Sequence, residues 1–210
     1  MNEVAGVILA GGLSRRMGGG DKALRLLGGK PLIAHVIERL SRQASPLAIN
    51  ANGDPARFQD FQLPIVPDAS FDYSGPLAGV LAGLKWAMQA APEAKFIATA
   101  ACDTPFFPET FVADCLKAAN GAYPAIVLAR SGGQTHPVFG LWPVALADDL
   151  ADALANGTRK VLHWTDRHPN FTAEFAPAVL GGGEADPFFN ANTPAELEEA
   201  NALLAKEAKR

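Results

Sequence analysis

The chain has 210 residues, of which 49% are hydrophobic and 19% are charged, a composition typical of one globular domain with a substantial core. It contains no apolar run of the about 18 residues that span a membrane, and its N-terminus lacks the basic region of a secretion signal. Two cysteines are too few for a disulfide framework, so we expect a reduced, cytoplasmic protein. The net charge of −4 argues against a nucleic-acid-binding protein.

The first predicted element is an apolar strand over 4–10, which runs directly into a loop rich in glycines and cations. Gly11 and Gly12 allow a sharp turn and bring backbone N–H groups close to a ligand. The loop also contributes a hydroxyl and three cations that can neutralise phosphate oxygens: Ser14, Arg15, Arg16 and Lys22. These features predict a triphosphate-binding loop.

Two well-known phosphate-binding loops do not fit this stretch. A P-loop needs Gly-Lys-Ser/Thr at the start of a helix, and a dinucleotide-binding loop needs Gly-x-Gly-x-x-Gly between strand and helix. The remaining alternative is an ordinary glycine-rich surface turn. The charge distribution favours binding, because five basic residues accompany two acidic ones in the first 30 residues of an acidic chain. A local cationic site of this kind suits a small polyanion.

Strands and helices alternate along the rest of the chain. Hydrophobic periodicity predicts helices over 31–43 and 75–90 and a third helix after Pro108, separated by strands over 47–51, 63–66 and 96–100. Further strands are expected over 125–129 and 137–142, and helices over 144–154, over 159–164 and from Pro194 onward. The alternation predicts a single α/β domain, 1–210, with a mostly parallel, doubly wound, Rossmann-like sheet flanked by helices.

Polar residues follow several of these strands, at the sheet edge where ligands bind in such folds. Asp103 comes just after the apolar strand 96–100, so its carboxylate should project at the edge of the sheet. Mg²⁺ prefers oxygen ligands and commonly bridges one or two carboxylates to phosphates, which makes Asp103 the candidate metal ligand. The alternative is that Asp103 caps the following helix.

Asn50 and Asp68 are the candidates for recognition of the base, because each follows a strand. A carboxylate can accept hydrogen bonds from guanine N1–H and N2–H₂ together, a donor pattern that cytosine and adenine do not offer. The alternative is that both residues simply end their strands in turns.

Asn190 and Asn192 are spaced so that both side chains would point the same way from an extended strand. Their carbonyl oxygens could complete a metal site or bind substrate, while the residues alone favour an Asx-turn and N-cap before the last helix. His136 is a weaker candidate, since a lone histidine before a strand is more often structural than catalytic.

The chain resembles a known family at three places. The run Leu9-Ala10-Gly11-Gly12-x-Ser14-x-Arg16-Met17-Gly18 with Asp21-Lys22 resembles the signature loop of the nucleotidyltransferases that activate small phosphorylated molecules with an NTP. The Ala-Gly-Gly form, Cys102-Asp103-Thr104-Pro105 and the Phe-x-Asn-x-Asn-Thr-Pro run ending at Pro194 resemble the molybdenum cofactor guanylyltransferase branch. A His-Pro pair at 136–137 also has a counterpart there, whereas 130–136 is otherwise loosely matched.

This resemblance implies an enzyme that transfers GMP from GTP to the phosphate of molybdenum-loaded molybdopterin and releases pyrophosphate. It implies nucleotide binding in the N-terminal half, acceptor binding in the C-terminal half and Mg²⁺ as cofactor. The implied catalytic residues are Arg16, Lys22 and Asp103. The implied nucleotide contacts are Leu9, Ala10, Gly11, Gly12, Ser14, Arg15, Lys22, Asn50, Asp68 and Asp103. The acceptor candidates are His136, Asn190 and Asn192.

Partners and alternatives follow from the same resemblance. We expect GTP and molybdopterin as ligands, transient contact with molybdoenzymes or cofactor-insertion proteins, and no nucleic acid or membrane. The nearest alternative is a cytidylyltransferase that uses CTP, either with the same acceptor or for an isoprenoid intermediate. A non-catalytic nucleotide-binding regulator would keep the same fold, although the presence of both Lys22 and Asp103 argues against it.

Overall fold

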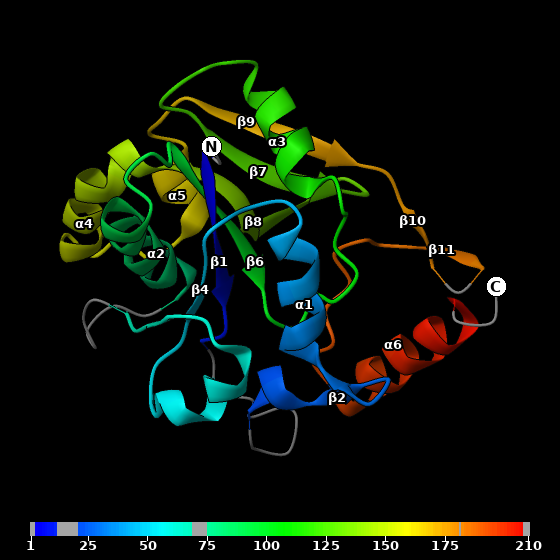
Figure 1. Cartoon of the computed structure of the whole chain (residues 1–210). Coiled ribbons are helices and arrows are strands. Elements are labelled where there is room, and N and C mark those ends of the chain that lie inside the picture. The colour runs from blue at the N-terminus through cyan, green and yellow to red at the C-terminus, as the bar shows by residue number, and fades with distance from the viewer. Residues whose placement is uncertain (1–2, 12–20, 69–74, 181, 208–210) are drawn as a thin grey trace.

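One seven-stranded sheet, in the order β5-β4-β1-β6-β8-β7-β9, forms the centre of the molecule (Figure 1). The structure is a computed structural model that describes residues 3–11, 21–68, 75–180 and 182–207. The strands are β1 (Val4–Leu9), β4 (Leu47–Asn50), β5 (Ile65–Val66), β6 (Phe96–Ala101), β7 (Ile126–Ser131), β8 (Gln134–Pro143) and β9 (Asn170–Phe175).

The sheet is mostly parallel, as predicted. Neighbouring strands run parallel from β5 through β4 and β1 to β6, and β7 is parallel to β9. β8 runs antiparallel to both β6 and β7. β7 and β8 form a hairpin whose two-residue turn, Gly132-Gly133, has φ angles of 54° and 81°, the left-handed backbone region that hairpin turns require and glycine tolerates.

The helices form two layers, one on each face of the sheet (Figure 1). α1 (Leu32–Ser41) and α3 (Phe111–Ala119) lie on one face, and α2 (Pro76–Ala90), α4 (Ala147–Ala155) and α5 (Val161–Thr165) lie on the other. β1 shows why both faces are covered. Ile8 belongs to the cluster that includes α1 and α3, while Val7 belongs to the cluster that includes α2, and both are completely buried.

The last helix, α6 (Pro194–Glu207), packs beside an N-terminal hairpin of β2 (Leu26–Leu27) and β3 (Lys30–Pro31). Leu27 and Ala200 are both fully buried in a third apolar cluster, and the Asn201 side-chain carbonyl accepts a 2.8 Å hydrogen bond from the Gly28 N–H. A short antiparallel pair, β10 (Ala178–Leu180) and β11 (Gly183–Ala185), lies beside α6. Segments from the two ends of the chain therefore lie side by side.

Within the described residues, no helix has both the length and the apolar character that crossing a membrane requires.

Candidate functional site

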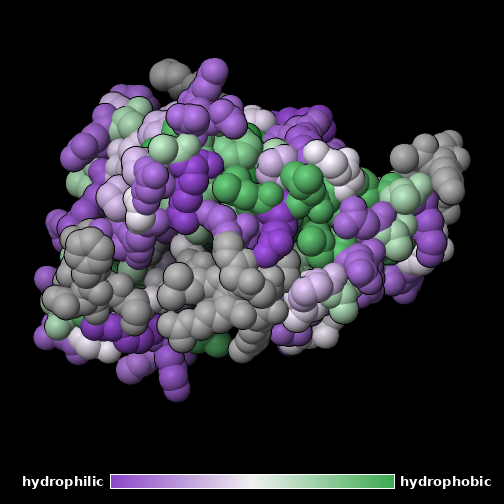
Figure 2. All heavy atoms as spheres, turned by 90° about the horizontal axis from the view of Figure 1, so that it is seen from below, coloured by the Kyte–Doolittle hydropathy of each residue, from purple (hydrophilic) through white to green (hydrophobic). Residues whose placement is uncertain are grey.

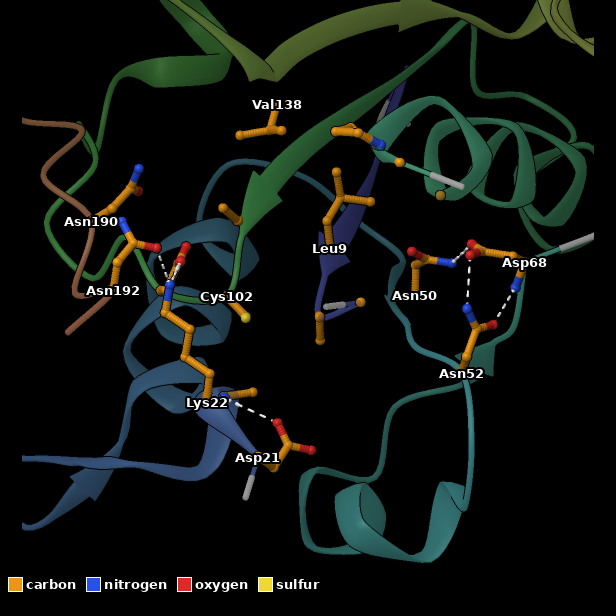
Figure 3. Close-up of a pocket in the computed structure, with 18 residues that line it drawn as sticks. Leu9, Asp21, Lys22, Asn50, Asn52, Asp68, Cys102, Val138, Asn190 and Asn192 are labelled. Carbon is orange, nitrogen blue, oxygen red and sulfur yellow. Dashed lines mark hydrogen bonds and ion pairs between the residues drawn. The ribbon is translucent and has the colours of Figure 1, made fainter. Parts of the chain in front are cut away.

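A cavity of about 610 Å³ opens where β1, β4, β5 and β6 end, which is the edge predicted from the order of the elements. Figure 2 views the molecule from this side and shows hydrophilic residues around most of its outline, with a hydrophobic area in the upper middle. Polar side chains stand at two ends of the cavity, and Leu9 and Cys102 lie between them (Figure 3). We call these ends the lysine end (Lys22, Asp103, Asn190, Asn192) and the Asp68 end (Asn50, Asn52, Asp68).

The lysine end is organised by Lys22, the first residue of the short helix η2 (Lys22–Leu24). Its ammonium donates to the carboxylate of Asp103 and to the side-chain carbonyl of Asn192 (Figure 3). The side chains of Lys22 and Asp103 are only 16% and 15% exposed, so bulk water screens this ion pair weakly. Three segments far apart in the chain thus meet at one ammonium group.

Asp103 lies after β6, as predicted, and the alternative that it caps a helix is wrong. The next helix, α3, begins at Phe111, and its N-cap residue is Thr110. The backbone carbonyl of Asp103 instead accepts a 3.0 Å hydrogen bond from the Ala191 N–H. This bond holds the segment that contains Asp103 against the segment that contains Asn190 and Asn192. The carboxylate is therefore free of any capping role and faces the cavity.

Asn190 and Asn192 line the cavity from a turn, as the residues alone favoured, and not from the extended strand that was the other interpretation. The Asn192 N–H donates to the Asn190 carbonyl at 3.1 Å, so the chain turns between them. The Asn190 side-chain carbonyl accepts from the Thr104 hydroxyl, whereas that of Asn192 accepts from Lys22. Figure 3 shows the two amides pointing in different directions.

The predicted cap before α6 exists and belongs to Thr193, while the side chain of Asn192 remains in the cavity. Thr193 Oγ1 accepts from the Glu196 N–H at 3.2 Å, and Glu196 Oε2 accepts from the Asn192 N–H at 2.8 Å. This arrangement is similar to a capping box, except that Glu196 bonds the N–H of the residue before the cap. It fixes the backbone of Asn192, and this places the side-chain carbonyl of Asn192 beside Lys22.

At the Asp68 end, two asparagine amides hold the carboxylate of Asp68. Asn50 donates to Oδ1 at 3.0 Å and Asn52 donates to Oδ2 at 2.8 Å, while Asn52 Oδ1 accepts from the Asp68 N–H at 2.9 Å. Because each carboxylate oxygen has two acceptor positions, one remains on each for a ligand. Asp68 therefore keeps acceptor capacity on both carboxylate oxygens, and it lines the cavity.

Cys102 lines the cavity without being a plausible nucleophile. Its side chain is buried, and burial, reinforced by the nearby Asp103 carboxylate, raises the pKa of the thiol far above its usual value. A thiol that stays protonated neither attacks phosphorus nor binds a metal. Cys102 therefore packs in this cavity without supplying a reactive thiolate.

Among the residues that the structure describes, no three acidic, histidine or cysteine side chains gather as a metal site. Asp103 nevertheless fits Mg²⁺ bound together with a nucleotide. Such an ion takes one or two carboxylates and completes its oxygen shell with phosphates and water. The side-chain oxygens of Asn190 and Asn192 line the same cavity and have the same hard-donor chemistry.

His136 lies outside this cavity, although it was predicted as an acceptor contact. It is buried, with its Nε2 2.7 Å from Ser131 Oγ, and its ring stacks on Phe188 with centroids 4.5 Å apart. Ser131 also donates to Asp186 Oδ1 at 2.6 Å. Burial lowers the pKa of His136, and the Asp186 carboxylate partly opposes that shift.

The remaining predicted nucleotide contacts divide into two groups. Leu9, Ala10 and Gly11 line the cavity. Gly12, Ser14 and Arg15 lie outside the described residues, as does the predicted catalytic residue Arg16.

Asn52 and Asp21 also line the cavity, although neither was predicted as a site residue. Asn52 lies two residues after β4, so the strand-end rule that found Asn50 could have found it too. Asp21 precedes Lys22, and its Oδ1 accepts from the Ala23 N–H at 3.1 Å, which caps η2. An aspartate before a short helix is a recognisable cap signal.

Comparison with known proteins places this cavity in a family context. Residues 6–170 match the MobA-like NTP transferase domain. A protein of Bradyrhizobium sp. named molybdenum cofactor guanylyltransferase is 49% identical over 97% of this chain and 94% of its own length.

Solved structures agree at the level of the fold. Molybdopterin-guanine dinucleotide biosynthesis protein A from Archaeoglobus fulgidus is similar with a TM-score of 0.73 and 24% identity, covering 96% of this chain and 99% of that one. The Rv0371C protein of Mycobacterium tuberculosis, solved as a complex with manganese, has a TM-score of 0.65 at 13% identity, covering 98% and 100%.

Proposed function

Because the chain belongs to the MobA-like NTP transferase family and shares nearly half its residues with a molybdenum cofactor guanylyltransferase, we propose that it transfers GMP from GTP to molybdopterin. The observation that carries this proposal is the cavity itself. A carboxylate with two free acceptor positions stands at the Asp68 end, and an ammonium group stands beside a carboxylate at the lysine end. A nucleoside triphosphate has the matching donors on its base and the matching charge on its phosphates.

The Asp68 end would select the base. Asp68 accepts from N1–H and N2–H₂ of guanine, while Asn50 and Asn52 keep the carboxylate oriented. Cytosine lacks this adjacent donor pair, which supports GTP over CTP as the substrate.

At the lysine end, Lys22 would bind phosphate oxygens and stabilise the charge of the departing pyrophosphate. A phosphate oxygen of the acceptor forms a bond to the α-phosphorus, and the bond from that phosphorus to the bridging oxygen breaks. Pyrophosphate leaves with the electron pair. Such a reaction needs alignment and charge neutralisation and no protein nucleophile, in keeping with the protonated Cys102. Arg16 and Arg15 are proposed to add positive charge to the same phosphates.

The proposal includes Mg²⁺ as the divalent ion, held by Asp103 together with the nucleotide. When bound, the ion would neutralise phosphate charge and polarise the reacting centre. The oxygen donors beside Asp103 support this assignment, with Asn190 and Asn192 as candidates for contact with the ion or the acceptor. His136 stays a predicted acceptor contact, although it is not among the residues that line the cavity.

The proposal is tested with purified protein, molybdenum-loaded molybdopterin, Mg²⁺ and each of the four NTPs in turn, measuring pyrophosphate and the product mass. We expect a guanine dinucleotide product, formed with GTP. Lys22→Ala and Asp103→Asn should each lower kcat/KM by about a hundredfold or more, as loss of a charge-stabilising group does. Chelation of the divalent ion should stop pyrophosphate release.

Lys30→Ala is the matched control, because Lys30 lies near Lys22 in the sequence but pairs with Glu38 on the surface. It should keep the activity of the unsubstituted protein. A dinucleotide formed faster with CTP than with GTP would contradict the proposal, and so would GTP binding without any pyrophosphate release.

Cytoplasmic location and transient contacts with molybdoenzymes or cofactor-insertion proteins belong to the same proposal, since the product must reach the enzymes that use it. Division into a nucleotide-binding N-terminal half and an acceptor-binding C-terminal half is also proposed, with one qualification. Asn190 and Asn192 come from the C-terminal half, yet they line the nucleotide cavity.

A further inference from the structure

Arg57, on the short helix η3 (Pro55–Phe61), is not one of the residues lining the cavity, yet it contacts Asn52 of the Asp68 end and Asp21, the residue before Lys22. One guanidinium nitrogen, Nη1, lies 2.8 Å from Asp21 Oδ2, and the other, Nη2, donates to the Asn52 carbonyl at 2.7 Å. The two contacts lead to different parts of the site.

Toward the lysine end, the contact passes through Asp21 to Lys22. Asp21 uses its second oxygen, Oδ1, to accept from the Ala23 N–H, and this bond begins η2 with Lys22 as its first residue. The side chains of Asp21 and Arg57 are 17% and 32% exposed, so solvent screens their ion pair only in part. The position of Arg57 therefore bears on where the Lys22 backbone lies.

Toward the Asp68 end, the contact passes through Asn52. Arg57 holds the backbone carbonyl of Asn52. The side-chain amide of Asn52 bonds Asp68 at both its backbone N–H and its carboxylate. A shift of Asn52 would move both of these bonds, and with them the oxygens that face the cavity.

The guanidinium is itself fixed in place. Its central carbon lies 4.6 Å from the centre of the Phe58 ring, and Phe58 is completely buried. An arginine packed over an aromatic ring presents its donors as a rigid planar fork, whereas lysine offers a single flexible ammonium. A lysine at this position could reach Asp21 or the Asn52 carbonyl but could not hold both in this geometry.

We propose that Arg57 is a positioning residue that sets the base-reading carboxylate of Asp68 and the phosphate-binding ammonium of Lys22 at matching positions for one nucleotide. The inference rests on the proposed function, because it takes GTP as the occupant of the cavity. Its specific consequence is that Arg57 governs affinity and base selectivity without touching the substrate.

The experiment compares Arg57→Gln and Arg57→Lys with the unsubstituted protein. Dissociation constants for GTP and CTP are measured by calorimetry, alongside kcat and KM for GMP transfer. We expect Arg57→Gln to weaken GTP binding and raise the KM for GTP by about tenfold, and to lower kcat at saturating GTP as well, because Lys22 loses part of its positioning. CTP binding should change less, so selectivity falls. Arg57→Lys should recover part of the loss.

Arg42→Gln is the matched control, because Arg42 is 59% exposed and pairs with Glu38 and Glu109 on the surface. It should leave GTP affinity and selectivity unchanged. Equal GTP affinity in the Arg57 and Arg42 variants would overturn the inference. A lower melting temperature and kcat in Arg57→Gln with unchanged GTP affinity would also overturn it, because that pattern indicates general support of the fold.

A mutant cycle tests the coupling directly. Asp21→Asn and Asn52→Ala are combined, and their effects on GTP affinity are expected to be non-additive in the presence of Arg57 and additive in the Arg57→Gln background. Additivity in both backgrounds would overturn the inference. These binding measurements separate the two proposals, since GTP affinity responds to Arg57 even if the acceptor of the reaction were a different molecule.

Discussion

At the scale of single residues, the carboxylate of Asp68 contributes both to the stability of the fold and to the proposed binding of GTP. Its carboxylate accepts from the Asn50 amide, which is itself only 4% exposed, and it also offers acceptor positions to the cavity. Removal of the carboxylate would leave a buried amide without one of its partners, which costs stability regardless of any ligand. Affinity and stability must therefore be measured together at this position.

We expect Asp68→Ala to raise the KM for GTP by about tenfold to a hundredfold, as loss of hydrogen bonds to a charged acceptor does. It should also lower the free energy of unfolding by roughly 1–3 kcal/mol, because one Asn50 N–H loses its acceptor while the amide keeps its bond to the Val66 carbonyl. Steady-state kinetics and urea unfolding give the two quantities. Unchanged GTP affinity would remove Asp68 from the nucleotide site.

His136 supplies a second prediction, on pH. Burial lowers its pKa in the folded protein below 6.5, the usual value, which we take for the unfolded chain. At pH values between the folded-state pKa and 6.5, the unfolded chain therefore binds more protons than the folded protein. The contribution to stability is thus fully present above pH 6.5 and is lost as pH falls through the folded-state pKa. His136→Gln should flatten this part of the dependence of unfolding free energy on pH.

His163→Gln is the control for that measurement, because His163 lies exposed on α5. Denaturant unfolding at a series of pH values from about 8 to 5 covers the window. If the slope in His136→Gln equals that of the unsubstituted protein, protonation of His136 does not contribute.

At the scale of elements, α2 uses glycines to approach the sheet. A methyl group on Gly79 would overlap the Asn50 side-chain oxygen and come within 2.9 Å of Leu9 Cδ2, whereas one on Gly83 would lie 2.8 Å from Val7 Cγ2. Both positions face the sheet one helical turn apart. Gly79 therefore adjoins the cavity, and Gly83 adjoins only core side chains.

This difference provides a matched pair of variants. Gly79→Ala and Gly83→Ala should each lower the free energy of unfolding by roughly 1–3 kcal/mol, because both overpack a tight contact. Gly79→Ala should in addition raise the KM for GTP by displacing Asn50. Thermal unfolding and GTP kinetics distinguish the two, and equal KM values would show that Asn50 adapts.

Elements with a strong periodic pattern were predictable from sequence, and their direction in the sheet was not. The helices α1 and α2 and the strands β4 and β6 lie within a few residues of their expected bounds. The reversal of β8 was missed because apolar periodicity is the same for either strand direction, although Gly132-Gly133 marks a hairpin turn. β9 was missed because Asn170, Thr172 and Glu174 give it little apolar signal.

The candidate site was also predictable from the sequence only in part. Strand ends correctly gathered Asn50, Asp68 and Asp103 at one edge, because parallel strands end together. Bonds between distant segments, such as Lys22 with Asn192 or Arg57 with Asp21, depend on loop paths that no local pattern encodes.

At the scale of the whole molecule, one nucleotide would contact segments from most of the sheet, so its binding should stabilise the entire fold. With Mg²⁺ present, GTP at about 100 times its dissociation constant should add about 2.7 kcal/mol to the free energy of unfolding. For a domain of this size that corresponds to a rise of about 5–10 °C in melting temperature. Differential scanning calorimetry measures the shift.

CTP at the same concentration is the control for this measurement and should produce a smaller shift. A larger shift with CTP than with GTP would argue for the cytidylyltransferase alternative and against base selection by Asp68.

The hydrogen bond between Lys22 and Asn192 joins residues 170 positions apart in the chain. The ribosome must therefore add all of those residues before that lysine can meet its amide partner. Nascent chains and products of premature termination upstream of Asn192 would lack a complete lysine end, however well their first strands had folded.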